Sequence, residues 1–242
     1  MIAFRCNGMA RSVAVALFFC CFDIGTAPAQ QLDAASVIRQ IDAAVKTRYE
    51  SIAGFTVTEH YAVYRGKDES RPMAEMTVKT TYRKDSGKSY DIVAESGPAV
   101  IRKFGFGPLL ANEKSINQPG NVAQSWFTSA NYEMTLKPGG IQRLDGRDCF
   151  VLAIKPRRKA PNLIEGTLWV DARDHSIVQI AGTPSRSPSV WAGTTHMMRR
   201  YANVDGFAMA THARAESNSF LFGRTIVTID YQDYHLQLRA AR

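Results

Sequence analysis

The chain has 242 residues, of which 30 are basic and 22 acidic, so its formal net charge is +8. This length predicts one domain, or one domain with a small appendage, and room for a sizeable core. Basic chains approach anionic lipid surfaces or nucleic acids by long-range attraction, but the export signal described next argues against nucleic acid.

Residues 1–29 have the pattern of a secretory signal. Arg5 and Arg11 supply positive charge, an apolar run follows at 13–22, and small residues close the segment. The run is shorter than the ~20 residues that span a bilayer. We therefore predict export by a cleaved signal, which leaves residues 30–242 as one domain in the periplasm.

Cysteine usage fits an exported chain. Three of the four cysteines lie in the signal, so the mature chain keeps only Cys149 and forms no intramolecular disulfide. We expect Cys149 to be a buried, small apolar side chain. Cys20 and Cys21 at the end of the apolar run leave open the alternative of a lipid anchor in the envelope.

The first elements of the mature chain are a helix and three strands. Asp33 is a suitable N-cap for a helix that reaches about Tyr49 and carries an apolar stripe along one side. Apolar side chains then alternate with a period of two, and Glu59 interrupts the apolar face of the first strand. The alternation predicts strands at 54–64, 74–82 and 89–94.

The segment between Ser96 and Ser129 has no such alternation. Glycines and prolines punctuate it, and its apolar residues have short helical spacings, which predict two short helices joined by loops. Apolar helices inserted between the strands of a meander must cover another apolar surface. We therefore expect this segment to be a lid over the mouth or concave face of the sheet.

Alternation returns from Tyr132 to Leu238 and predicts a long antiparallel meander. Turn residues separate its strands, among them Pro138-Gly139-Gly140, Asp145-Gly146, Asp205-Gly206 and Asn218. The fold class we predict is α+β: a half-open antiparallel β-barrel of about ten strands with an N-terminal helix and a helical lid inserted mid-chain. The seven strands of this part lie near 132–137, 148–155, 165–171, 175–182, 195–204, 206–216 and 219–231.

Motifs for catalysis or metal binding do not stand out. The five histidines lack metal-ligand spacing, although a composite zinc site from separate strands stays open. No Gly-x-Ser-x-Gly turn or glycine-rich phosphate loop occurs. Asp171 and Asp174 are expected to cap a hairpin turn rather than act as acid and base. We predict no enzyme, no metal and no cofactor.

Two groups of basic residues have two interpretations each. Arg157, Arg158 and Lys159 lie in a loop that is either a solvated turn or a contact to anionic headgroups or to an acidic partner. Arg199 and Arg200 are adjacent on a strand, so one of them faces inward. That arginine pairs with an acidic ligand group or with a structural carboxylate.

Aromatic and methionine side chains on the strands form an adaptable apolar wall. They either fill a closed core or line a cavity. A sheet of about ten strands curls into a shell too wide for side chains to fill, which favours a cavity. We predict that its lining includes Phe55, Val57, Tyr61, Met76, Val78, Tyr82, Leu109, Trp126, Phe127, Trp169, Met197, Phe207 and Met209.

In this order of elements, and in Gly166-Thr167-Leu168-Trp169-Val170-Asp171 followed by Ile177-Val178-Gln179-Ile180, the chain resembles the bacterial outer-membrane lipoprotein-sorting proteins of the LolA/LolB-like group. The resemblance implies a half-open barrel, closed by helices, that holds the acyl chains of lipoproteins or other lipids without a cofactor. It implies a soluble periplasmic carrier or chaperone with an envelope protein as donor or acceptor and transient membrane-surface contact. The alternative is a non-enzymatic envelope scaffold with a filled barrel and a basic partner-contact loop.

Overall fold

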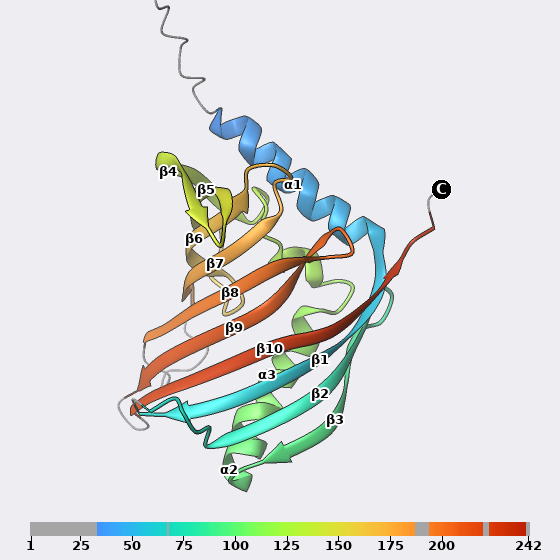
Figure 1. The fold of residues 1–242 in the computed structure, drawn as a ribbon, viewed down its shortest axis with the longest axis vertical. Helices are drawn as coiled ribbons and strands as arrows, with labels where there is room; N and C mark the ends of the chain where they lie inside the picture. The colour runs from blue at the N-terminus through green and yellow to red at the C-terminus, as the bar shows by residue number, and fades with distance from the viewer. Residues whose placement is uncertain (1–32, 67, 187–193, 220–222, 241–242) are drawn as a thin grey trace, which may run out of the picture. The chain divides into compact units, whose positions relative to one another are not determined.

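The computed structural model describes residues 33–66, 68–186, 194–219 and 223–240 (Figure 1). The predicted export signal, residues 1–29, lies outside these ranges and stays a prediction. The elements are α1 (Ala34–Ser51), β1 (Ile52–Arg65), β2 (Ala74–Arg83), β3 (Gly87–Ser96), α2 (Ala99–Ile101), the π-helix η1 (Arg102–Phe106), α3 (Gly107–Ile116), the 3-10 helix η2 (Val122–Ser125), β4 (Tyr132–Leu144), β5 (Arg147–Pro156), β6 (Ile164–Asp171), β7 (Ile177–Pro184), β8 (Thr194–Val204), β9 (Phe207–Ser219) and β10 (Gly223–Leu238).

The ten strands form one antiparallel sheet in the order β3-β2-β1-β10-β9-β8-β7-β6-β5-β4. β3 and β4 are the two edge strands, so the sheet is not closed. The long pairing of β1 with β10 joins the first three strands to the last seven. This arrangement confirms the predicted α+β class and half-open barrel.

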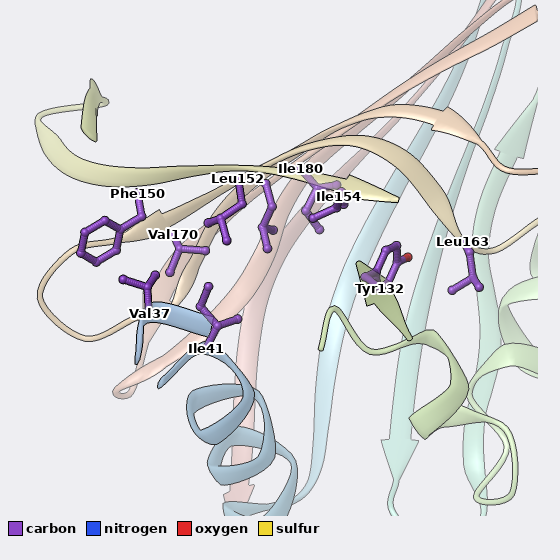
Figure 2. Packing of buried hydrophobic residues seen from close by; sticks show 10 residues of the cluster. Val37, Ile41, Tyr132, Phe150, Leu152, Ile154, Leu163, Val170 and Ile180 are labelled. Carbon is purple, nitrogen blue, oxygen red and sulfur yellow. The ribbon is translucent and has the colours of Figure 1, made fainter. Parts of the chain in front are cut away.

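Helix α1 begins where the sequence predicts. The Asp33 carboxylate accepts hydrogen bonds from the backbone N–H groups of Ala35 (3.1 Å) and Ser36 (3.2 Å), as an N-cap does. Val37 and Ile41 point from the helix toward β5, β6 and β7 (Figure 2). They form the first apolar cluster with Tyr132, Phe150, Leu152, Ile154, Leu163, Leu168, Val170 and Ile180.

The segment between β3 and β4, which we call the insert, is helical as predicted. Its helices α2, η1 and α3 run on without a break instead of forming two separate short helices, and η2 follows. Figure 1 shows α3 (green) behind β10 and β1, with α2 at the lower end of the same helical segment. Phe106 of the insert packs in a second apolar cluster with Tyr61, Val63, Ala74, Met76, Val78, Ala213 and Ile229.

One row of residues shows that α1 and the insert cover the same face of the sheet. Ile180 of the first cluster lies opposite Arg199, and Arg199 lies opposite Ala213 of the second cluster. Directly opposite residues of neighbouring antiparallel strands point to the same face. We call this covered face the inner face and the other the outer face.

The predicted turns are confirmed at two hairpins and wrong at two places. Asp145-Gly146 joins β4 to β5 and Asp205-Gly206 joins β8 to β9, with all four residues at positive φ. One wrong prediction is Asn218, which lies within β9 and pairs with Arg224 of β10. The other is Pro138-Gly139-Gly140, which is not a turn between strands. These residues lie within β4, at a register shift where Gly139 and Gly140 have φ values of 87° and 59°. A bulge and a proline are both tolerated there because β4 is an edge strand.

Candidate functional site

Four of the predicted lining residues belong to the second apolar cluster or pack against it, and three more lie on the same two strands. Tyr61, Met76 and Val78 are buried members of that cluster, and Leu109 of the insert packs against it. Farther along the same strands, the rings of Phe55 and Tyr82 stack with centroids 5.0 Å apart. Val57 of β1 is also buried. The inner face of β1 and β2 is therefore apolar over most of its length.

The other predicted lining residues lie elsewhere. Phe127 packs against the first cluster, stacked on Tyr132 at 5.3 Å, and Trp126 lies 4.6 Å from the Tyr49 ring of α1. Met209 is buried, and its Sδ accepts a hydrogen bond from Arg48 (3.3 Å). The structure thus divides the predicted lining between the two clusters and their surroundings.

Trp169, Met197 and Phe207 are not members of either apolar cluster. Trp169 lies on the outer face, because its neighbours Leu168 and Val170 belong to the first cluster on the inner face. Its indole N–H donates to Gln142 (3.0 Å). Phe207 begins β9 beside the hairpin turn, opposite Val204.

The hollows on the described part of the molecule include two that are lined by strands. One, of about 450 Å³, is lined mainly by polar side chains of β4, β5 and β6, including Glu133, Lys137 and Thr167. The other, of about 250 Å³, includes Met197, His196 and Arg214 from β8 and β9. The lining of neither hollow includes a residue of the insert, so neither lies between the insert and the inner face.

The insert is held to the inner face by few buried side chains. α2 and α3 contain no buried residue among those whose side chains the structure describes, and Phe106 of η1 is 2% exposed. Leu109, Leu110 and Ile101 are only partly buried against the second cluster. Segments with few buried apolar contacts open at low free-energy cost.

Four charged side chains form what we call the polar seam: Glu59 of β1, Lys88 of β3, Glu113 of α3 and Arg199 of β8. Lys88 Nζ lies 3.1 Å from Glu113 and 3.7 Å from Glu59, and Arg199 lies 3.8 Å from Glu113. The side chains of Glu59 and Lys88 are 1% and 10% exposed. The inward arginine is therefore Arg199, and the carboxylate beside it belongs to the insert.

Charge interactions in the seam outweigh the effect of burial. Burial alone would lower the pKa of Lys88, but the carboxylates of Glu113 and Glu59 raise it above its ordinary value. Burial alone would raise the pKa of Glu113, but Lys88 and Arg199 lower it below its ordinary value. Lys88 and Glu113 are consequently both charged at neutral pH.

Tyrosines surround the seam. The Tyr61 hydroxyl donates a hydrogen bond to Glu59. Burial raises the pKa of Tyr231 to about 12, so this phenol stays neutral. Among the described residues, the buried Glu59 Oε1, Thr80 Oγ1 and Tyr90 hydroxyl have no hydrogen-bond partner. The seam thus holds more hydrogen-bonding capacity than its own contacts use.

Sequence reasoning identified only part of this site. Glu59 was visible as an interruption of an apolar face, and Arg199 as half of a pair with one member facing inward. Lys88, Glu113 and Arg48 carried no signal. Arg48 reaches from α1 to donate to the Ala208 carbonyl (2.8 Å), and burial lowers its pKa.

The basic loop has contacts that neither sequence interpretation included. Arg157 Nε donates to the Ser129 carbonyl (2.9 Å), and Arg158 donates to Asn131 (2.9 Å) and to the Gln124 carbonyl. These bonds attach the β5–β6 loop to the end of the insert. Lys159 is exposed, so its predicted role in headgroup or partner contact stays a prediction.

Other predictions about chemistry can be placed directly. Asp171 accepts a hydrogen bond from the Arg173 N–H and Asp174 from the Ser176 N–H, both at 2.9 Å, so both carboxylates cap the β6–β7 turn as predicted. Cys149 is buried, which confirms that prediction. Within the described ranges, no cluster of three His, Cys, Asp or Glu side chains could hold a metal ion.

No helix in the described part of the chain combines the length and apolarity needed to cross a membrane. No family model matches the chain, and neither does any curated protein.

Several solved structures resemble the chain in their arrangement of elements. A LolA superfamily protein from Nitrosomonas europaea has 15% identity and a TM-score of 0.44, over 84% of this chain and 93% of its own. A DUF1329 family protein from Desulfovibrio piger has 13% identity and a TM-score of 0.42, over 85% of this chain and 95% of its own. An outer membrane lipoprotein-sorting protein domain from Vibrio parahaemolyticus has 14% identity and a TM-score of 0.44, over 84% of this chain and 93% of its own.

Proposed function

We propose that the mature chain, residues 30–242, is a non-enzymatic periplasmic carrier or chaperone of lipid acyl chains, either free lipids or the acyl groups of lipoproteins. In this proposal an acyl chain lies on the inner face of β1, β2, β9 and β10 after the insert has moved away. The cavity exists in the loaded state, when the ligand replaces the insert.

The small number of buried apolar side chains that α2, η1 and α3 contribute carries this proposal. Burying a phenylalanine side chain contributes about 1.5–3 kcal/mol, and Phe106 is a fully buried anchor of the insert. An acyl chain gains about 0.8 kcal/mol for each CH₂ it buries. A handful of methylenes on the apolar inner face therefore offsets the loss of the Phe106 contact.

The open sheet adds a route of entry. β3 is an edge strand, and α2, the first helix of the insert, begins three residues after it ends. Ile92 and Val93 of β3 and Val100 of α2 are 55%, 66% and 61% exposed. We propose that a ligand enters between this edge and the insert, and that transfer occurs at the surface of a membrane or of an envelope protein.

Lipid extraction and mass spectrometry of the gently purified mature chain test the proposal. We expect co-purified lipid, and saturable binding of a fluorescent acyl probe after the lipid has been stripped. Protein that is empty in every preparation and does not bind the probe would refute a carrier and favour the scaffold.

A pair of alanine substitutions locates the binding face. Ala213→Phe fills space in the second cluster on the inner face and should abolish probe binding. Ala153→Phe adds the same ring beside the outer hollow and should leave binding unchanged. Equal effects of the two substitutions would contradict binding on the inner face.

A further inference from the structure

The polar seam lies where the two apolar clusters meet. Arg199 is placed between Ile180 of the first cluster and Ala213 of the second, on the same face. Lys88 of β3 contacts both Glu59 of β1 and Glu113 of the insert, and Glu113 also approaches Arg199. A chain that occupies the inner face beneath the insert must therefore pass close to these charges.

The charges of the seam balance only while the insert is in place. The sheet supplies two cations, Lys88 and Arg199, and one carboxylate, Glu59. Glu113 supplies the second carboxylate, and it comes from α3 of the insert. When the insert moves away, the sheet keeps one positive charge in excess beside two apolar clusters.

While the insert covers the inner face, two hydroxyl groups near the seam also lack hydrogen-bond partners among the described residues. The Tyr90 and Thr80 hydroxyls lie on directly opposite residues of β3 and β2, and neither has a partner among the described residues. Thr80 is fully buried, so solvent does not satisfy it. A polar group placed beside Lys88 would find free donors on the same strands.

We propose that the ligand is an anionic amphiphile, whose carboxylate or phosphate group replaces the Glu113 carboxylate between Lys88 and Arg199 while its acyl chain covers the apolar inner face. This inference rests on the carrier function proposed above and specifies its ligand class. A buried cation that loses its counter-ion is strongly destabilising. A neutral lipid leaves Arg199 without the Glu113 carboxylate and leaves Lys88 with Glu59 alone, whereas an anionic lipid replaces the missing negative charge. In the absence of ligand, the Glu113 carboxylate occupies the position that the anionic group of the ligand would take.

Charge states support the exchange. The pKa of Lys88 lies above and that of Glu113 below its ordinary value because each stabilises the charged form of the other. The cation therefore requires an anion at every pH near neutrality.

The experiment compares cis-parinaric acid, a fluorescent fatty acid, with its methyl ester on the stripped mature chain at neutral pH. We expect the acid to bind at least tenfold more tightly than the ester. Lys88→Met and Arg199→Met should bring this ratio toward one. Lys79→Met, an exposed lysine on the neighbouring strand, and Arg200→Met, the adjacent residue on the opposite face, should leave the ratio unchanged.

Glu113→Gln gives a distinct signature. It removes the counter-ion from the closed form, so both acid and ester should bind more tightly while their ratio persists. An excess of acetate or inorganic phosphate should not displace the acid. Displacement by either would show that the seam takes a free anion rather than a lipid head and would overturn the proposal.

The outcomes separate this inference from the carrier function. Equal affinity of the wild-type chain for acid and ester overturns the anionic ligand class and leaves the carrier standing. If the acid still binds more tightly than the ester in both Lys88→Met and Arg199→Met, the seam does not select the anionic ligand. No binding of acid or ester removes the carrier function and this inference with it. The ratio of the two affinities in the wild-type chain tests the anionic ligand class even where a variant folds poorly.

Discussion

The stability of Glu113→Gln provides the sharpest test of the polar seam, because this change removes the negative charge beside both Lys88 and Arg199. Loss of one partner from a buried ion pair destabilises by about 3–5 kcal/mol. The Glu113 side chain is 19% exposed and Lys88 keeps Glu59 at 3.7 Å, which reduces the loss. We expect about 2–3 kcal/mol and a Tm lower by about 4–12 °C.

The effect of Glu113→Gln should depend on pH in a defined direction. Burial alone would raise the pKa of Glu113, but Lys88 and Arg199 lower it below its ordinary value of 4.5. A carboxyl group whose pKa is depressed by folding stabilises the fold fully above its unfolded pKa, and this stabilisation is lost as the pH falls through the folded pKa. The difference between wild type and variant should be full at about pH 7 and should vanish once Glu113 is protonated.

Urea unfolding, followed by circular dichroism at several pH values, measures this difference. Glu95→Gln is the matched control, since Glu95 pairs with Arg102 at 2.5 Å but both side chains are about one-third exposed. That pair should contribute no more than about 1 kcal/mol. A Glu113 effect as small as the control, or one that stays constant from neutral to acidic pH, would refute the buried seam.

Two further substitutions test the packing of the sheet and of α1. Gly166→Ala places a Cβ 2.1 Å from the Ala181 carbonyl oxygen and should lower the free energy of unfolding by about 3 kcal/mol or more. Gly105→Ala, inside η1, places a Cβ in ordinary contact with Ile101 at 3.5 Å and should raise it by about 0.5–1 kcal/mol; a similar response of both glycines to urea would contradict the close approach of β6 and β7. Ile41→Ala empties a fully buried position between α1 and the sheet and should destabilise by about 2–5 kcal/mol; a loss below about 1 kcal/mol in thermal unfolding would show that α1 does not pack as described.

Most of the fold could be predicted from the sequence because local signals agree with the final contacts. The period of two along β1 and β2 sets which residues face inward, and Asp205-Gly206 fixes one hairpin through its positive φ values. The error at Pro138-Gly139-Gly140 has a physical cause. The same residues that favour a turn also suit a bulge, and only the position of β4 at the sheet edge decides between them.

The site was harder to predict because its partners come from distant elements. Glu59 was noticed as a polar residue on an apolar face, yet its neighbour Lys88 lies on a strand that does not touch β1 in the sheet order. Glu113 belongs to an insert without strand alternation. Which carboxylate meets Arg199 depends on how α3 lies across the inner face, and local periodicity holds no information about that placement.

The presence of four charges on an otherwise apolar face is itself informative. Well-packed apolar side chains usually replace a buried ion pair without loss of stability, so stability alone does not account for Lys88 and Glu113. What the charges provide is position and selectivity. Apolar contacts such as those of Leu109 and Leu110 are non-directional, whereas Glu113 is attracted to cations on two strands at once, β3 and β8. The insert therefore packs on the inner face in one defined position. The same two cations disfavour the binding of a ligand that carries no negative charge.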